Sequence, residues 1–339
     1  MPIVRVVVLC ACTLAGVAHA DGNGTGGSAW TWAFQLENDM FGDGYDRAYT
    51  HGMRLAAGRE SQAWNAVQGV LPSWLSGVKT CAKSREEWGV GLSMYTPEDI
   101  QSTALRARDR PYAGWLFGDA SLLCERDQGA LPWIGSELDV LRLELGWVGP
   151  SNKVGEIQKW WHDDVITAPH PSGWHHQLND ELAFSVSSYR LWKSRPVRLG
   201  PLNLDLVPHA GAALGTLHTY AALGATLRLG TRAPDGFSPP LIRPSSPGSM
   251  FIESSAPNVY LFLGVEGRGV ARNLFLDGNT FEDSHSVDKH TWIGDIQAGV
   301  VYQLGRVRLS YTNIWRSKEF DGQATGTAFG SFNVAVAFD

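Results

Sequence analysis

The stretch EWGVGLSMYT, residues 87–96, alternates bulky apolar side chains with glycine and serine. If it forms a strand, the bulky side chains share one face, because successive side chains in a strand point to opposite sides. These bulky residues are Trp88, Val90, Leu92 and Met94. The stretch therefore predicts a β-strand with one apolar face and one small or polar face.

The stretch LRLELGW, residues 141–147, indicates what kind of sheet this strand joins. Its apolar face carries Leu143 and Leu145, while Arg142 and Glu144 point the other way. Charged residues opposite an unbroken apolar face do not suit a soluble sandwich. They suit a barrel with a wet interior and a lipid-facing exterior.

The same alternation recurs along the chain, strongly in some segments and weakly in others. The strong segments are 201–214, 223–230, 259–268, 295–304, 306–312 and 332–338, and the weaker ones are 29–38, 49–59, 111–124 and 181–192. We therefore predict an all-β fold, an antiparallel transmembrane β-barrel of about twelve strands. An even number of strands brings both ends of the chain to one side of the membrane.

The first 20 residues have the layout of a cleaved secretory signal peptide. A basic residue, Arg5, precedes an apolar run over 6–17 and the small-residue end Ala18-His19-Ala20. That run is too short to span a bilayer as a helix. By length alone the remaining residues would suit about two soluble domains, but barrels of this size commonly form one unit. We expect residues 21–339 to be a single barrel domain.

Charge and cysteine content narrow the partners and the compartment. The net charge is −6 and the pI is about 5.9, which provides no basic field for nucleic acid. Cys10 and Cys12 leave with the signal peptide. The remaining Cys81 and Cys124 fall at the same end of neighbouring predicted strands, so that a disulfide and two free thiols both remain open.

If the N-terminus is periplasmic, six connections open outside the cell. These are about 40–48, 97–110, 149–180, 215–217, 273–289 and 317–325. The connections 60–86 and 231–257 fall on the periplasmic side, and both are longer than the turns expected there. The polar residues of interest gather on the external rim.

Glu37-Asn38-Asp39 stands at the first external junction, and Thr50 follows shortly after it. A carboxylate, an amide and a hydroxyl at the rim could bind a hard cation such as calcium through oxygen. The alternative is that Asn38 and Asp39 only shape the turn.

Gln158 and His162 lie in the third external loop, four residues apart, so one helical turn would place both on one face. A His near a cation could remove a proton from water as a general base. The alternative is a solvated loop histidine. The neighbouring Trp160-Trp161 pair would pack this short helix on the rim or against lipid. Two His/Ser neighbours, His170 with Ser172 and His285 with Ser286, lack an orienting third residue for nucleophilic catalysis.

A set of motifs along nearly the whole chain, taken in order, resembles the lipid A 3′-O-deacylase (LpxR) family. The motifs are Glu37-Asn38-Asp39, Asp46-Arg47 with Tyr49-Thr50 and Gly52, Tyr95-Thr96-Pro97, Asp109-Arg110-Pro111-Tyr112-Ala113-Gly114, Gln158 with His162, Gly173-Trp174 with Gln177-Leu178, and Arg272 to Phe281. Their shared order is more specific than any one of them.

The resemblance implies a Gram-negative outer-membrane barrel of twelve strands that uses Ca²⁺ to hydrolyse the ester-linked 3′ acyloxyacyl chain of lipid A. It places Asn38 and Asp39 at the metal and oxyanion site, with Asp39 holding the cation, and assigns Thr50, Gln158 and His162 as further catalytic residues. His162 would be the base that activates water. We expect a monomer whose active site faces the outer leaflet and whose substrate is the lipid A of lipopolysaccharide.

The resemblance also implies basic residues in the second external loop that meet lipid A phosphates. The chain offers Arg106, Arg108 and Arg110 there. Arg110 could equally be an ion-pair partner inside the barrel. Two other functional classes stay open at this point, namely a non-catalytic channel or structural barrel, and a phospholipase A-type barrel that depends on a serine.

Overall fold

The computed structural model describes residues 30–42, 48–64, 81–127, 129, 131–166, 168–237, 251–252 and 256–338, so the predicted signal peptide lies outside the described residues. The strands are β1 (Trp30–Asn38), β2 (Ala48–Glu60), β3 (Lys83–Thr96), β4 (Ala113–Arg126), β5 (Ile134–Val148), β6 (Glu181–Ser194), β7 (Val197–Leu199), β8 (Leu202–Gly215), β9 (His218–Gly230), β10 (Asn258–Asn273), β11 (Trp292–Leu304), β12 (Val307–Arg316) and β13 (Thr327–Phe338). The helices are α4 (Val154–Trp160) and α5 (Leu274–Asp277), with short helical turns η1 (Asp39–Phe41), η2 (Pro150–Asn152), η3 (Trp161–Ile166) and η4 (Trp174–His176). Within these ranges, no helix is both long and apolar enough to cross a bilayer.

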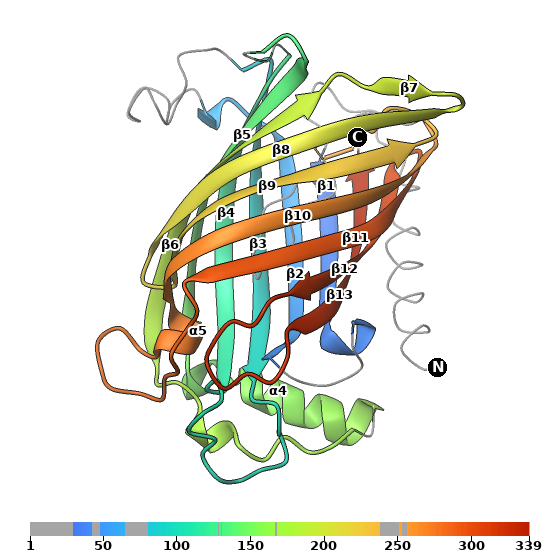
Figure 1. Cartoon of the computed structure of the whole chain (residues 1–339). Helices are drawn as coiled ribbons and strands as arrows, with labels where there is room; N and C mark the ends of the chain where they lie inside the picture. The colour runs from blue at the N-terminus through green and yellow to red at the C-terminus, as the bar shows by residue number, and fades with distance from the viewer. Residues whose placement is uncertain are drawn as a thin grey trace.

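Twelve of these strands close into one antiparallel barrel (Figure 1). β1 pairs with both β2 and β13, and the ring closes where Ser185–Leu191 of β6 pairs with His209–Gly215 of β8. The predicted fold class is confirmed. β7 pairs only with β8 and lies outside the ring. β7 was not predicted from the sequence, because a run of three residues is too short to establish an alternating pattern.

The two ends of the barrel differ. Trp30, the first residue of β1, pairs with Phe338, the last residue of β13, so the chain enters and leaves the barrel at the same end. The opposite end carries α4, α5 and the long loops (Figure 1). The connections there are 39–47, 97–112, 149–180, 216–217, 274–291 and 317–326, close to the predicted external loops. At the end where β1 begins and β13 finishes, parts of two long connections, residues 65–80, 238–250 and 253–255, lie outside the described residues.

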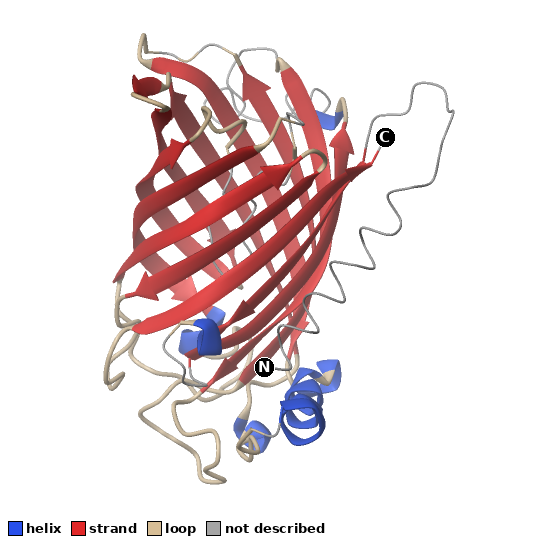
Figure 2. Cartoon of the chain, turned by 90° about the vertical axis from the view of Figure 1, so that its right-hand side faces the viewer, coloured by secondary structure: helices blue, strands red, loops and turns tan. Residues whose placement is uncertain are grey.

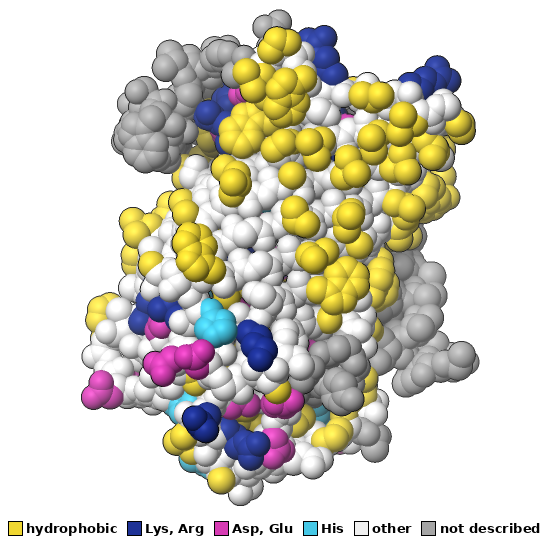
Figure 3. All heavy atoms as spheres, in the orientation of Figure 1, with side chains coloured by type: hydrophobic (Ala, Val, Ile, Leu, Met, Phe, Trp, Pro, Cys, Tyr) yellow, Lys and Arg dark blue, Asp and Glu magenta, His cyan; other side chains and the backbone are white. Residues whose placement is uncertain are grey.

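The outer face of the wall is apolar, as the alternation predicts. Trp88 and Val90 are 56% and 61% exposed, and Leu143 and Leu145 are also exposed. Hydrophobic side chains spread over the barrel surface, whereas charged ones lie towards its two ends, with most acidic ones at the loop end (Figure 3). Met94 is an exception within its own strand, because it belongs to the outward set of β3 but is buried.

The inner face is filled by ion pairs and aromatic rings. Arg54 contacts Glu87 and Asp119 at 2.6 Å each, and Arg142 contacts Asp119 at 3.0 Å. All these carboxylates are buried, so each depends on its guanidinium partner. Towards the loop end, an aromatic cluster fills the interior, with members Tyr49, Tyr95, Trp115, Phe117, Phe275 and Phe329. The interior is therefore packed side chain against side chain rather than simply wet.

Cys81 and Cys124 form a disulfide with a Cα–Cα distance of 5.3 Å. It ties the segment before β3 to the end of β4, and Ala82 also donates a backbone hydrogen bond to Glu125 there. Of the two states that the sequence leaves open, the structure has the bridge.

Arg54→Met should lower the free energy of unfolding by about 3–5 kcal/mol, because it leaves Glu87 buried without its cation. Urea unfolding in detergent micelles measures this loss. The matched control is Arg59→Met. The Arg59 side chain is half-exposed where it pairs with Glu86, so its loss should lower the free energy of unfolding by less than about 1 kcal/mol. Equal losses in the two variants would contradict the interior ion-pair account.

Candidate functional site

A row of outward-facing residues crosses six strands at the loop end of the wall. Strand register links these residues in the order Asn313, Gly330, Asn38, His51, Met94 and Gly114. Asn38 faces outward because its neighbour Glu37 faces inward, where Tyr49 donates a hydrogen bond to it. The row therefore lies on the lipid side of the barrel and not in its lumen.

One end of this row is covered by η1. The side-chain oxygen of Asn38 accepts a hydrogen bond from Met40 N at 2.9 Å, which starts the turn. Phe41 then packs edge-on against Phe332, and Tyr311 donates a hydrogen bond to Phe41 O at 3.0 Å. Asn38 thus does shape the turn, as one of the two sequence interpretations expects. The same turn buries Asp39, which is 1% exposed.

Thr50 reaches this outer face through a β-bulge. The register between β2 and β3 shifts between Tyr49 and His51, which leaves Thr50 as the extra residue. Its hydroxyl is 2.6 Å from that of Thr96, and its carbonyl accepts a hydrogen bond from Asn38 Nδ2 at 3.0 Å. Asn38 Nδ2 also lies 3.3 Å from His51 Nδ1. Asn38 and Thr50 are therefore in direct contact.

The other end of the row is covered by α4, which lies outside the wall at its loop end (Figure 2). α4 contacts β3 and β4. Asn152, just before it, donates a hydrogen bond to Gly114 O at 2.7 Å. A side chain at Gly114 would come within 2.6 Å of Val154 Cβ, so glycine is what lets the helix lie this close. Met94 pairs with Gly114 in the same row, which explains why it is buried.

Gln158 and His162 are on the buried side of this helical segment, 2% and 4% exposed. Ile157 and Trp160 are exposed instead. The predicted shared face of Gln158 and His162 is therefore present, and the helix turns it toward protein. His162 Nδ1 lies 2.7 Å from Pro169 O. Because a carbonyl only accepts, Nδ1 carries the proton and Nε2 is the basic nitrogen.

The ends of the third loop are held together by Asp180. Its carboxylate accepts hydrogen bonds from Ser151 N at 2.9 Å and from Trp147 Nε1 at 3.0 Å. Burial acts to raise the pKa of Asp180, but these hydrogen bonds outweigh it and hold the pKa below its ordinary value. The folding stability that these hydrogen bonds contribute is fully present above the pKa that Asp180 has in the unfolded chain. It is lost as the pH falls through the lower pKa of Asp180 in the folded protein. Gly149 approaches Asp180 closely at φ +114°, a conformation that favours glycine.

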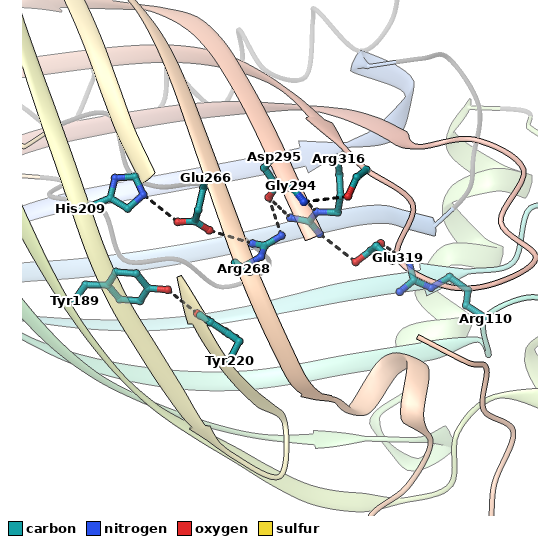
Figure 4. A network of polar contacts seen from close by, with 11 residues as sticks. Arg110, Tyr189, His209, Tyr220, Glu266, Arg268, Gly294, Asp295, Arg316 and Glu319 are labelled. Carbon is teal, nitrogen blue, oxygen red and sulfur yellow. Dashed lines mark hydrogen bonds and ion pairs between the residues drawn. The ribbon is translucent and has the colours of Figure 1, made fainter. Parts of the chain in front are cut away.

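The three arginines of the second loop separate in the structure. Arg106 and Arg108 are exposed and line a groove of about 380 Å³ between the second and sixth external loops. Arg110 is buried inside the mouth, 3.6 Å from Glu319 and over the ring of Tyr95. It ends a chain of polar contacts across the barrel interior (Figure 4). The other members of that chain are Glu319, Arg316, Asp295, Arg268, Glu266 and His209. Arg110 is thus the interior ion-pair partner that the sequence left as an alternative.

The His/Ser neighbours do not form nucleophile pairs. Ser172 donates to the backbone oxygen of His170, whose ring contacts Asp163 at 2.9 Å instead. The ring of His285 lies 2.7 Å from Asp109 O.

The donor types at the site decide which metal ion it suits. Among the residues that the structure describes, no group of three or more His, Cys, Asp or Glu could hold a metal ion. The region of Asp39 offers one buried carboxylate beside amide, hydroxyl and backbone oxygens. Such an all-oxygen set with a single charge fits calcium and does not fit zinc.

Three residues that were not predicted from the sequence hold the candidate site residues: Thr96 holds Thr50, Pro169 holds His162, and Trp174 holds Gln158. Thr96 and Trp174 belong to motifs that the sequence displays, but a motif does not say which side chain it holds. Pro169 acts through its carbonyl, for which the residue type gives no signal.

Comparisons with known proteins bear on the whole chain. The sequence profile of the family described as outer membrane protein LpxR matches residues 6–338. Among solved structures, LpxR from Salmonella typhimurium has a TM-score of 0.69 and 19% sequence identity, covering 91% of this chain and 100% of its own. The β-domain of the Bordetella autotransporter BrkA has a TM-score of 0.46 at 11% identity, covering 92% and 100%. No curated protein matches the sequence.

Gly114→Ala should loosen α4 from the wall, because the added methyl overlaps Val154. We expect the docking of α4 to weaken by about 1–3 kcal/mol, seen as faster hydrogen exchange in 154–160. Gly118→Ala is the matched control on the same outer face of β4, since an added carbon there meets only a backbone oxygen at 3.8 Å. The docking account fails if both variants exchange at the wild-type rate.

Proposed function

The chain belongs to the LpxR family of outer-membrane proteins, and on this premise we propose that it is a calcium-dependent lipid A 3′-O-deacylase. The reaction is hydrolysis of the ester that links the 3′ acyloxyacyl chain to lipid A. One observation carries the proposal. Gln158 and His162 are buried on a helix that covers the outer face of the wall, the same face on which Asn38 and Thr50 meet.

The position of these residues favours a membrane lipid as substrate. A site outside the wall at the external rim is reached sideways from the outer leaflet, where lipid A resides. The barrel interior offers a poor route for a channel, because its described part is closed by ion pairs and aromatic rings. A serine-dependent phospholipase is disfavoured because neither His/Ser neighbour places its hydroxyl on a histidine ring.

In the mechanism we propose, His162 is the general base. Its Nδ1–H is held by Pro169 O, so Nε2 accepts a proton from water as the water oxygen attacks the ester carbonyl carbon. The tetrahedral intermediate then collapses, the bond to the sugar oxygen breaks, and Nε2 returns the proton to that oxygen. The products are a free acyloxyacyl acid and a 3′-hydroxyl, with no acyl-enzyme.

The negative charge that develops on the carbonyl oxygen must be stabilised by a cation or by hydrogen-bond donors. Calcium, when bound at Asp39, would supply a positive charge for this oxygen. Gln158 is an amide of this chain that can donate hydrogen bonds to it. Thr50 and Asn38 keep the loop that carries Asp39 on the outer face.

Arg106 and Arg108 suit the phosphate groups of the substrate. Both are exposed, and Arg106 has only a half-exposed partner, Asp99, at 3.5 Å. A guanidinium in such a position can exchange a weak surface pair for a phosphate. Arg110 is left out of this role because it is buried against Glu319.

His162→Ala should lower the rate of deacylation by about 10²–10⁴-fold, because the water loses its base. Mass spectrometry of lipid A from cells that make each variant measures the loss of one acyloxyacyl unit. The control is His170→Ala, which removes an exposed histidine of the same loop and should leave the rate within about twofold. Heat-modifiable gel migration shows that the barrels fold. Full activity of His162→Ala would remove His162 as the base.

Chelation of calcium should abolish deacylation by the purified protein, and added calcium should restore it. Asp39→Ala should lose roughly 10²-fold or more in rate and should no longer respond to calcium, since its carboxylate is the buried charge at the site. Activity that survives chelation would refute the metal role while leaving the hydrolase itself intact.

A further inference from the structure

Gln158 is held by a residue to which sequence and mechanism give no role. Trp174 Nε1 donates a hydrogen bond to Gln158 Oε1 at 2.7 Å, and both side chains are buried. The indole N–H can only donate. The Gln158 atom that faces it must therefore be the oxygen. This requirement fixes which way the amide is turned.

Trp174 itself is held from two sides. Its ring lies over Gly155 in the first turn of α4, where an added side chain would come within 2.6 Å of the indole. Tyr112 packs against the ring with centroids 5.1 Å apart and donates its hydroxyl hydrogen to Ile100 O at 3.0 Å. The indole therefore has little freedom to follow Gln158, and its N–H is a fixed donor.

The other end of the amide has no such partner. Gln158 Nε2 is buried and makes no hydrogen bond within the described part of the chain. A buried amide nitrogen without an acceptor is costly, and such groups in folded proteins call for an explanation. A donor kept ready for charge that forms only during the reaction is such an explanation.

We propose that Trp174 is a positioning residue that turns the Gln158 amide so that its N–H groups, and not its oxygen, face the reacting carbonyl. The inference rests on the proposed function and deepens it. Without the indole N–H the amide can rotate, and its carbonyl then opposes the developing oxyanion instead of stabilising it. Trp174 touches neither water nor substrate in this role.

Trp174→Phe tests the proposal, because it keeps a ring over Gly155 and removes the donor. With purified protein and lipid A, we expect kcat to fall by about tenfold, the bias that one ordinary hydrogen bond gives to an orientation, with KM within about twofold. Gln158→Leu should fall further, by about 10²–10³-fold, since it removes the oxyanion donor itself. In the double variant, Trp174→Phe should add nothing to the loss from Gln158→Leu.

Tyr112→Phe is the matched control. It also removes a buried aromatic donor beside Trp174, but it leaves the bond to Gln158 in place. Its kcat should stay within about threefold of wild type. A purely structural role for Trp174 predicts instead that both aromatic variants lose activity together with stability, and that the losses of Trp174→Phe and Gln158→Leu are independent. Either result, or a wild-type kcat in Trp174→Phe, would overturn the proposal.

A second readout separates this inference from the proposed function. In protein labelled with ¹⁵N-tryptophan, the indole resonance missing from Trp174→Phe belongs to Trp174. It should shift upfield in Gln158→Leu, because its acceptor is gone. If it does not shift, the contact is absent and the inference fails even when the wild type deacylates lipid A. If the wild type releases no acyloxyacyl acid, the proposed function fails, and Trp174 has no reacting carbonyl to serve.

Discussion

The strict alternation of side chains across a closed wall is the constraint on which the rest of this structure depends. Glu37 and Asn38 are neighbours in β1, yet one faces the interior with Tyr49 and the other faces the lipid side with His51. A register slip of one residue would exchange them. The interior ion pairs resist such a slip, because Arg54, Glu87 and Asp119 come from three strands and would each lose a buried partner. The interior thus fixes which residues appear outside.

On the outside, the site needs room that a barrel wall full of large apolar residues does not give. Gly330 and Gly114 provide it in the outward row, where Phe41 of η1 and Val154 of α4 lie against the strands. The two covers leave His51 and Asn38 between them in the row. The proposed site therefore lies between the wall and a helix at the loop end of the barrel, while ion pairs and aromatic rings fill the interior.

Alternation alone predicted the fold, because period two is a local property that any strand displays, and it placed residues such as Leu143 and Arg142 on the correct faces. It could not place Met94, whose burial depends on a helix sixty residues away in the chain. Likewise the spacing of Gln158 and His162 predicted their shared face, but not that the face is turned to protein. Thr96, Pro169 and Trp174 meet the residues that they hold only in the folded protein. Arg110 is buried and Arg106 is exposed because Arg110 lies closer to the start of β4. Local sequence patterns predict neither these partners nor the burial of Arg110.

Site-specific photo-crosslinking in the native membrane can show whether the proposed site meets its substrate on the lipid side of the wall. A benzophenone amino acid is placed at Met53, which faces outward one step below His51 in β2, or at Asn333, which faces inward opposite Gln35. We expect a lipopolysaccharide adduct from position 53 and none from position 333. An adduct from the inward position, with none from the outward one, would contradict this expectation.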